Sequence, residues 1–589
     1  MLVNIFSVIA DQASAIFGVL LIIVLSQILV TIALKKIFDN QLTTNEYFAL
    51  GITGWLLPTA LLATLPFLFG WRPSASFNLF FIISLFGIST FFLLRLNHHP
   101  EPDSKLTILF LFLFLVVSIA LRFALISKAI LPSYFDSAEH YLLIKNILGN
   151  SNGIITLLTT NYYHLGFHFI AAFAASTFQI EIAKTMLILG QIVLAILPFS
   201  LFFIVRYASN SNTAGIFAIC LAAFGWYMPA HTMDWGKYPA LTSLGLIPFV
   251  LSLAYLFAQN KNMLSTGKQR ALYILIGIGI LVSGFIHSRA LVIIGIVFMS
   301  WTIVTWQQKL PRAQRIVLFL TVIVAIILEI IYIQKQNILT LLFDPYINKS
   351  IGITASVLFL SIFAQRQYPQ LTLTGILTIC FLLGSLFIPV LGLIPGHDNL
   401  TLLDRPFVEM FLFMPLAFIG GLGLAGLGSA LQQKIIKPQF IGLFAITLVL
   451  INAYYTYNLY PSDCCVIVGN DDVTAMDWIN NKLPVNARIG ISATELKVIS
   501  SEVSEGYVGG DAGIWITPLT GRVTFPIRYD ANFSDQNTLA NLCRMKLNYL
   551  YIGELGQNFN EAQISAQTAW YKVILSMPKV KVYEVVGCK

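Results

Sequence analysis

Residues 107–128 read TILFLFLFLVVSIALRFALISK, a long and almost entirely apolar run. Apart from Arg122 and the final lysine, it carries no charged side chain. An α-helix needs about 20 predominantly apolar residues to cross the hydrocarbon core of a bilayer. The stretch therefore predicts a transmembrane helix.

The composition of the whole chain agrees with a membrane protein. Of 589 residues, 57% are hydrophobic and 11% are charged, and the mean hydropathy is +0.79. Soluble domains carry roughly 25% charged residues. The formal net charge of +8 does not indicate nucleic-acid binding, because the basic residues lie between apolar runs, where they set topology. The sequence also contains no P-loop and no glycine-rich dinucleotide motif after a strand.

Further apolar runs predict about 14 transmembrane helices in total. Three of the runs are shorter than a full span: 271–286, 290–306 and 351–365. The complete set is 15–34, 48–70, 76–95, 107–128, 185–205, 213–230, 240–258, 271–286, 290–306, 315–333, 351–365, 371–393, 408–430 and 438–457.

Lysine and arginine set the orientation. If the N-terminus lies outside, every inside loop carries at least one of these residues, as the positive-inside rule requires. We therefore expect a multi-pass plasma-membrane protein with residues 1–459 in the membrane and residues 460–589 outside. The outer part alternates a helix-like stretch, Asp472–Lys482, with β-rich runs such as Arg488–Ser492, which predicts a small α/β domain.

Segment 129–184, between the fourth and fifth runs, is too long for a turn. Its amphipathic stretches 137–149 and 163–178 predict helices on or in the outer interface. The segment begins with Tyr134-Phe135-Asp136-Ser137-Ala138-Glu139-His140. Asp136 at the membrane surface suits a general base or an ion ligand. The alternative is that Asp136 and Glu139 form a capping box that opens the helix.

Four more outer motifs carry polar side chains. His164 and His168 share a helical face at metal-ligand spacing, but the absence of a third ligand nearby favours interfacial histidines. His231 to Pro239 holds Asp234 and Lys237 between aromatic residues; an aromatic belt would explain the lysine but not the acid. The sequences His287-Ser288-Arg289 and Asp404-Arg405-Pro406 place arginines where a lipid phosphate would lie, although an interfacial anchor also explains Arg405.

These segments together resemble the GT-C superfamily of membrane glycosyltransferases. In that family, a large first outer loop with interfacial helices starts near an acidic residue, as in Tyr134-Phe135-Asp136. A Gly-Phe-His-type stretch often follows, matched by Tyr162–His168, and the next outer loop holds a second acid, matched by Asp234. Many members end in an extracytoplasmic domain. Here Gly509–Trp515 faintly resembles a motif in the soluble domain of oligosaccharyltransferase, although a tight turn explains it as well.

The resemblance implies a GT-C-like fold and a hexosyl- or pentosyltransferase. It would move a sugar from a polyprenyl-phosphate-type lipid donor to a glycan, lipid or protein acceptor on the extracytoplasmic side. Asp136 and Asp234 would be catalytic: Asp136 would deprotonate or orient the acceptor, and Asp234 would support a cation, a histidine or the sugar. The substrate-binding residues would be Glu139, His140, His164, His168, Lys237, His287, Arg289, Asp404 and Arg405.

Two questions stay open at this point. No Asp-x-Asp or paired acid stands at position 136, so dependence on Mg²⁺, Mn²⁺ or Ca²⁺ is undecided, and no other cofactor is expected. The alternative function is a polytopic transporter or lipid flippase, because Arg122 and Glu329 fall inside predicted spans. Against it, the acids lie mostly at outer helix ends and no internal repeat is visible.

Four of the six cysteines lie in the predicted outer domain, which favours disulfides if the compartment is oxidising. Adjacent cysteines rarely pair, because disulfide geometry requires a larger Cα separation. We therefore expect Cys464 and Cys465 to bond to Cys543 and Cys588 in one of the two possible ways. Free buried thiols are the alternative.

Overall fold

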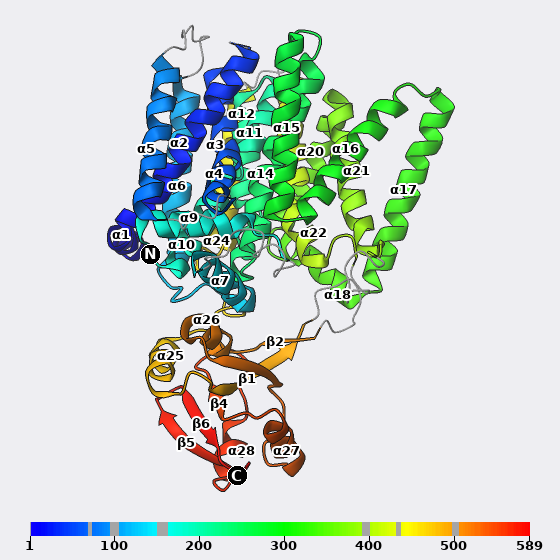
Figure 1. Ribbon diagram of the computed structural model, residues 1–589. Helices are drawn as coiled ribbons and strands as arrows, with labels where there is room; N and C mark the ends of the chain where they lie inside the picture. The colour runs from blue at the N-terminus through cyan, green and yellow to red at the C-terminus, as the bar shows by residue number, and fades with distance from the viewer. Residues whose placement is uncertain are drawn as a thin grey trace.

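A bundle of helices forms the membrane body of the protein, and a smaller domain with a β-sheet lies beneath it (Figure 1). The computed structural model describes residues 2–39, 41–68, 74–94, 105–149, 163–390, 401–431, 438–496 and 506–588. The N-terminus lies at the end of the bundle that faces the C-terminal domain. The two ends of the chain are therefore on the same side of the bundle, as the predicted orientation requires.

The membrane body is entirely helical in the part of the chain that the structure describes, apart from one short bridge between Pro389 and Thr401. Its helices are α1 (Leu2–Asp11), α2 (Ala13–Phe38), α3 (Thr44–Gly54), α4 (Leu56–Leu68), α5 (Ala75–Leu94), α6 (Lys105–Ile126), α7 (Tyr134–Gly149), α9 (Gly166–Phe178), α10 (Ile182–Ile196), α11 (Phe199–Ser209), α12 (Asn212–Phe224), α13 (His231–Asp234), α14 (Tyr238–Asn260), α15 (Thr266–Ile286), α16 (Arg289–Gln307), α17 (Arg312–Gln334), α18 (Asn337–Thr340), η1 (Leu341–Phe343), α19 (Asp344–Ile347), α20 (Ile351–Gln367), α21 (Pro369–Gly384), η2 (Ser385–Phe387), α22 (Arg405–Phe411), α23 (Phe413–Leu431) and α24 (Pro438–Thr456).

Among the described residues, eleven helical stretches are long and apolar enough to cross a bilayer. The count becomes twelve if Leu341–Ile347 and Ile351–Gln367, which meet at 84°, form one broken span. The protein is therefore a polytopic α-helical membrane protein, as predicted. The stretch formed by α10 and α11 is central, with 94% of its apolar window buried, whereas only 6% of the corresponding window of α17 is buried.

Each of the 14 predicted runs coincides with a helix, but not every helix is a full span. The apolar part of α5, Ala75–Phe91, and all of α12 are too short. The predicted run 213–230 overshot α12, because the chain turns after Gly225 and Pro229 cannot continue a helix. In the described part of the chain, two of the predicted runs therefore coincide with helices that are too short for a full span.

The two helices predicted in segment 129–184 are present as α7 and α9. Helix α7 lies between the membrane body and the C-terminal domain (Figure 1). Helix α9 is buried along most of its length and packs against α4, α7 and α10. It therefore dips into the bundle and does not lie on its surface. The first part of the predicted motif Tyr162–His168, residue 162, lies outside the described residues.

The C-terminal part is a small α/β domain, as predicted. Its six-stranded mixed sheet has the order β2-β1-β4-β6-β5, and β3 pairs in parallel with β1. The strands are β1 (Arg488–Glu495), β2 (Tyr507–Gly509), β3 (Val523–Arg528), β4 (Tyr549–Ile552), β5 (Tyr571–Ser576) and β6 (Lys581–Val585). The helices are α25 (Asn470–Lys482), η3 (Ala512–Trp515), α26 (Ile516–Thr520), α27 (Gln536–Arg544) and α28 (Glu561–Ala566).

Helix α7 joins the membrane body to this domain. Ala138 belongs to the same buried apolar cluster as Trp515 of the domain, and Tyr141 packs against that cluster. The rings of Tyr141 and Trp515 meet edge to face with centroids 5.6 Å apart. Lys145 Nζ donates a hydrogen bond to the carbonyl of Pro518 at 2.7 Å. One side of α7 therefore packs against the C-terminal domain.

The disulfide prediction was wrong. Cys464 pairs with its neighbour Cys465, and Cys543 pairs with Cys588. The fold explains the second pair, because Gly587 lies against Leu539 of α27 and so brings the end of the chain to the end of that helix. The first pair lies in the segment between α24 and α25. That segment contains no strand or helix that would bring its cysteines close to α27.

Candidate functional site

Asp136 lies in the first turn of α7 and forms an ion pair with Lys237. Both side chains are partly exposed. The capping-box alternative was wrong, because α7 begins at Tyr134, two residues before Asp136. Glu139, the other half of that box, is exposed and interacts electrostatically with Asp136. The carboxylate of Asp136 therefore does not cap α7 but pairs with Lys237, which directly precedes α14.

The turn from His231 to Lys237 presents that lysine. Gly236 has φ of +64° and its backbone lies against α7. A Cβ at this position would lie 2.9 Å from the carbonyl oxygen of Ser133 and 3.0 Å from the nitrogen of Ser137. Only glycine tolerates both this conformation and this approach. Lys237 follows directly, so the packing of Gly236 on α7 directs the lysine to Asp136.

Four histidines gather beside this ion pair. His140 Nδ1 and His168 Nε2 are 3.1 Å apart in a buried hydrogen bond. The rings of His164 and His287 contact each other at an interplanar angle of 59°, with centroids 4.1 Å apart. Tyr163 contacts all four rings. His164 and His168, which were predicted as an i, i+4 pair, therefore each contact a histidine from another element.

Burial determines the charge of these groups. It lowers the pKa of His140 and of His287 well below the ordinary value, and it lowers the pKa of His164 to about 4. Burial also acts to lower the pKa of Lys237, but the charge and hydrogen bond of Asp136 outweigh it and raise that pKa above its usual value. At pH 7 the site therefore combines neutral imidazoles with a charged lysine.

Two more ion pairs stand at the start of α16 and α22. Arg289 pairs with Asp404, which also caps α22 by accepting the N–H of Phe407 at 3.0 Å. Arg405 Nη1 donates to Glu409 Oε2 at 3.0 Å. Lys237 interacts electrostatically with Asp404 as well as with Asp136, so the pairs adjoin.

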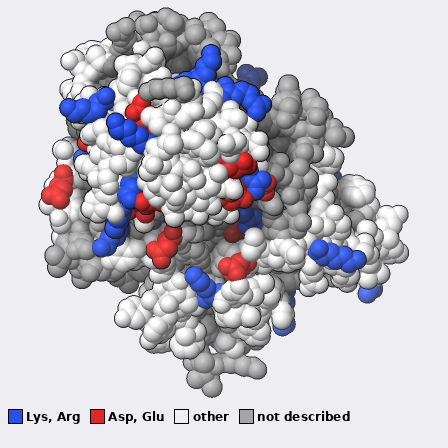
Figure 2. Space-filling model, turned by 90° about the horizontal axis from the view of Figure 1, so that it is seen from below, with Lys and Arg blue, Asp and Glu red and all other residues white. Residues whose placement is uncertain are grey.

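We call this assembly the polar cluster. It contains three cations, their three acids and four histidines: Lys237, Arg289, Arg405, Asp136, Asp404, Glu409, His140, His164, His168 and His287. Seen from the side of the C-terminal domain, the surface carries basic and acidic side chains in small mixed groups (Figure 2). The structure therefore gathers nine of the predicted site residues and adds Glu409, which lies four residues after Arg405.

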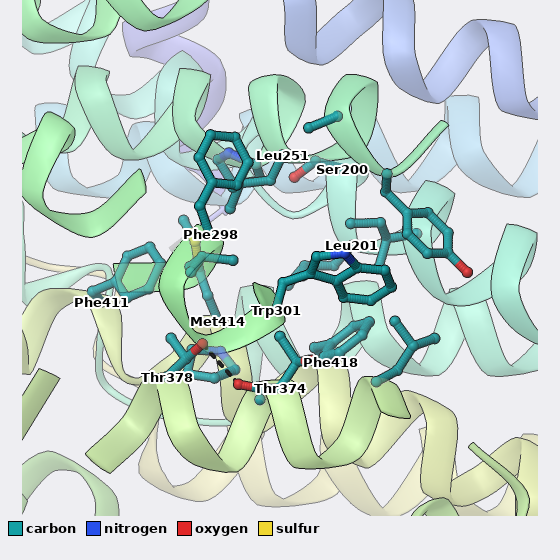
Figure 3. A pocket seen from close by; sticks show the side chains of 18 of the residues that line it. Ser200, Leu201, Leu251, Phe298, Trp301, Thr374, Thr378, Phe411, Met414 and Phe418 are labelled. Atoms are coloured by element: carbon teal, nitrogen blue, oxygen red, sulfur yellow. Dashed lines mark hydrogen bonds between the residues drawn. The ribbon is translucent and has the colours of Figure 1, made fainter. Parts of the chain in front are cut away.

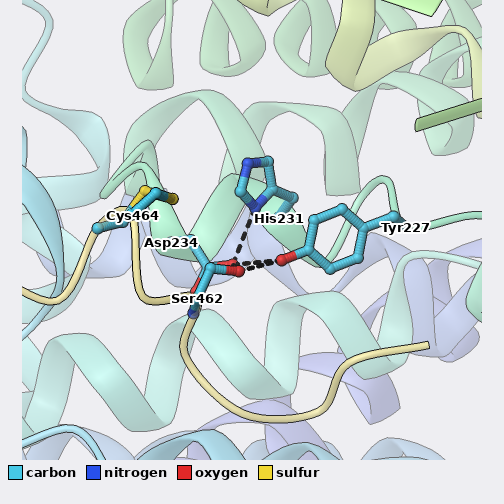
Figure 4. The surroundings of a disulfide bond; sticks show 6 residues. Tyr227, His231, Asp234, Ser462 and Cys464 are labelled. Carbon is cyan, nitrogen blue, oxygen red and sulfur yellow. Dashed lines mark hydrogen bonds and ion pairs between the residues drawn. A yellow bond between two sulfur atoms is a disulfide. The ribbon is translucent and has the colours of Figure 1, made fainter. Parts of the chain in front are cut away.

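Asp234 belongs to a different network. Its Oδ1 accepts the N–H of Ser462 at 3.1 Å, and its Oδ2 contacts Ser462 Oγ at 2.8 Å, Tyr227 Oη at 3.0 Å and His231 Nδ1 at 2.9 Å. Figure 4 shows these three side chains directed at the carboxylate, with the Cys464–Cys465 disulfide on the same loop as Ser462. Asp234 is only 2% exposed. Nothing in the sequence pointed to Ser462, which is 228 residues away.

The donor atoms of the polar cluster do not fit the divalent cation that the sequence left open. No three His, Cys, Asp or Glu side chains gather as metal ligands in the described ranges. Asp136 is engaged by Lys237, and His140 is hydrogen-bonded to His168. Asp404 and Glu409 are likewise engaged by Arg289 and Arg405. We assign no step to a metal ion.

An apolar cavity of about 310 Å³ lies deeper in the membrane body (Figure 3). Its walls come from α11, α14, α16, α21, α22 and α23, and include Leu201, Leu251, Phe298, Trp301 and Phe418. Helix α22 links the two features, because it begins at Arg405 in the polar cluster and ends at Phe411, which lines the cavity. This cavity was not predicted, because the residues that form its walls are ordinary residues of apolar spans.

Comparison with known proteins gives a family but no activity. No match is found among curated proteins. Among solved structures, the oligosaccharyltransferase of Archaeoglobus fulgidus in complex with zinc and sulfate is similar with a TM-score of 0.37 and 11% identity, over 74% of this chain and 67% of that one. Similarity at that level supports no argument about function. The family described as "Family of unknown function (DUF6541)" matches residues 47–387, more than half of the chain. The chain therefore belongs to the DUF6541 family.

Proposed function

We propose that this protein is a membrane glycosyltransferase. It would move a sugar, a hexose or a pentose, from a polyprenyl-phosphate-type lipid to a glycan, lipid or protein acceptor. The observation that carries the proposal is the Asp136–Lys237 pair next to the Arg289–Asp404 pair at one end of the spans. A carboxylate base beside several cations is what transfer from a phosphate leaving group needs.

The ion pairs suggest how a donor would prepare the site. In the structure each cation of the polar cluster is neutralised by an acid. The phosphate of an incoming donor would compete with those acids for the cations, because arginine and lysine bind phosphate oxygens strongly. Contact between Lys237 and the phosphate would release the carboxylate of Asp136. The base would then become free only when the donor is in place.

The reaction itself needs one proton transfer and one displacement. The acceptor oxygen forms a bond to the anomeric carbon of the sugar, and the bond from that carbon to the phosphate oxygen breaks. The leaving phosphate keeps the electron pair, and the cations of the cluster stabilise its growing charge. The acceptor proton passes to the Asp136 carboxylate. The neutral imidazoles of His164 and His287 are suited to hydrogen bonds with sugar hydroxyls.

The membrane placement supports a lipid donor. Its phosphate would lie at Arg405 or Arg289, and its apolar chain would extend along α22 into the cavity that Phe411 and Phe418 line. We place the polar cluster and the C-terminal domain on the extracytoplasmic side of the plasma membrane. The lysines and arginines of the sequence favour that orientation, and two disulfides in and next to the domain are in keeping with an oxidising compartment.

The decisive experiment uses full-length protein in nanodiscs. It is incubated with a panel of polyprenyl-phosphate hexoses and pentoses and with glycan, lipid and peptide acceptors, and the release of polyprenyl phosphate is measured. We expect Asp136→Asn to lower the rate by about 10²–10⁴-fold, the usual contribution of a general base. The matched control is Asp477→Asn, which removes an exposed carboxylate from α25 and should leave the rate unchanged. Absence of polyprenyl phosphate release by the wild type across the whole panel would refute the proposed function, and release by Asp136→Asn at the wild-type rate would refute the role of Asp136 as the base.

A transporter or flippase is the second candidate, and one observation favours it. Glu329 lines a second cavity of about 660 Å³ among α17, α20 and α21, and its Oε2 has no hydrogen-bond partner within the described part of the chain. Ionisable groups inside spans often mark transport pathways. Glu329→Gln separates the two functions: it should leave polyprenyl phosphate release intact in a transferase. Lipid or solute movement across proteoliposomes that requires Glu329, without any sugar transfer, would establish the transporter instead.

A further inference from the structure

The hydrogen bonds of Asp234 leave its carboxylate little capacity for a substrate. A carboxylate offers about four acceptor positions. Asp234 uses them on the backbone and hydroxyl of Ser462, the hydroxyl of Tyr227 and the ring of His231. Because the side chain is also buried, an acceptor sugar or a donor phosphate could reach it only after several of these bonds had broken. A direct chemical role is therefore less well supported than a structural one.

What Asp234 holds is the segment that follows α24. We call residues 462–465 the linker loop. Ser462 begins it, and the loop turns back on itself where the N–H of Cys465 donates to the carbonyl of Ser462 at 3.0 Å. The Cys464–Cys465 disulfide closes its other end. Asp234 thereby fixes a short, covalently braced loop at the junction between membrane body and C-terminal domain.

The linker loop in turn holds the start of α7. The carbonyl of Cys465 accepts the N–H of Tyr134 at 3.0 Å. Tyr134 has φ of +67°, a left-handed conformation that is unfavourable for a residue with a side chain. Surrounding structure must hold such a residue in place. Asp136 follows two residues later, so the contact with Cys465 sets where the first turn of α7, and hence the carboxylate of Asp136, is placed.

We infer that Asp234 is a positioning residue that places Asp136 through the linker loop. The inference rests on the proposed function for the role of Asp136. The turn from His231 to Lys237 then acts on α7 in two ways: Asp234 holds the linker loop, while Gly236 and Lys237 contact the first turn of α7 directly. The first turn of α7 is therefore held by the linker loop and by the Gly236–Lys237 contacts, which keep the reactive carboxylate beside the cations.

The test uses Ser462, because it lies outside the polar cluster. In Ser462→Ala the full-length protein loses the hydroxyl contacts to Asp234 and Tyr227 and keeps Asp136, Lys237 and all the arginines. Hydrogen–deuterium exchange is followed in peptides covering residues 133–140, in nanodiscs. We expect exchange there to rise about tenfold, as for the loss of one hydrogen bond to a charged group. In the same variant, kcat for polyprenyl phosphate release should fall by about tenfold or more, since small misplacements are costly.

Three comparisons make the result specific. Ser462→Thr keeps the hydroxyl and should restore both exchange and kcat. Ser565→Ala removes a hydroxyl from α28, far along the chain from α7, and should change neither. The KM for the donor should stay within about twofold, because the cations are untouched. Unchanged exchange at residues 133–140 in Ser462→Ala would overturn the inference, whether or not kcat falls. If the wild type transfers no sugar, the proposed function fails, and exchange alone still decides whether the loop holds α7.

Discussion

Ion pairs between residues that are far apart in the chain hold the polar cluster together, as in Lys237–Asp136 and Arg289–Asp404. Asp136, Lys237, Arg289 and Asp404 were all predicted to belong to the site, yet Arg289 and Asp404 are 115 residues apart and nothing local pairs them. Glu409 could have been found, because it follows Arg405 by four residues and such pairs meet on a helix. Long-range partners such as these depend on how the helices pack, which composition and spacing do not reveal.

The buried histidines should make the stability of the protein depend on pH. In the unfolded chain His164 has a pKa near 6.5, whereas burial lowers its folded pKa to about 4. Between these values the unfolded state binds more protons, so the free energy of unfolding decreases as the pH falls from about 6.5 to about 4. His140 and His287 act in the same direction. Full-length protein in detergent should therefore show a lower unfolding temperature at pH 5 than at pH 7.

The matched variant for this prediction is His164→Gln. Glutamine stays neutral throughout the range, so the decrease in unfolding temperature between pH 7 and pH 5 should be smaller in the variant than in the wild type. The difference between the two proteins isolates His164 from the other buried histidines. An equal decrease in both would show that His164 already titrates normally in the folded protein.

At the scale of helices and loops, the periodic and apolar segments were predicted well and their ends were not. Helix α7 and helix α25 were found close to their observed bounds, whereas the predicted run 213–230 ignored the break after α12. The burial of α9 was also missed in part, because an apolar helix at an interface and one inside a bundle have similar sequences. The connection between α24 and α25 had no signal except its adjacent cysteines, and their pairing was predicted wrongly.

The two disulfides should differ in their effect on the C-terminal domain. The Cys543–Cys588 bond closes a loop of 45 residues in the sequence and should stabilise the domain by about 2–4 kcal/mol. The Cys464–Cys465 bond joins neighbours, so it restricts the unfolded chain very little. Cys543→Ser should therefore clearly lower the urea concentration at which the domain unfolds, and Cys464→Ser/Cys465→Ser should not. Urea unfolding of the full-length protein, monitored by hydrogen–deuterium exchange in α27 and β6, would measure both effects. A larger effect of Cys464→Ser/Cys465→Ser than of Cys543→Ser would contradict this expectation.

At the scale of the whole molecule, the sequence predicted a polytopic membrane body with an α/β domain after it, and the structure has both. Hydropathy and the change of composition near residue 460 were sufficient, because the bilayer imposes long apolar runs that a soluble domain lacks. Which compartment each face meets remains a prediction from the lysines and arginines. The structure adds that the N-terminus and the domain share one face.

Orientation can be tested with single cysteines in intact cells. Asp477→Cys places an accessible thiol on α25, and Asn262→Cys places one in the exposed turn between α14 and α15 at the other end of the bundle. A maleimide that cannot cross membranes should label the first variant and not the second. Wild type provides the background, since Cys220 and Cys380 are buried and the other four cysteines are paired. Labelling of Asn262→Cys but not of Asp477→Cys would show that the topology is the reverse of the predicted one.

Helix α7 contributes both to the polar cluster and to the core of the C-terminal domain, so the two parts of the protein depend on each other. One side of this helix carries Asp136, and another side contributes Ala138 and Tyr141 to the apolar cluster of the C-terminal domain. A chain cut after α24 would leave Tyr141 without Trp515 and Tyr134 without the carbonyl of Cys465. The domain alone would lose the contact of Tyr141 with Trp515, which is fully buried in the intact protein. The two parts are therefore not interchangeable units, and swapping the domain for another would require rebuilding the helix that bears the reactive acid.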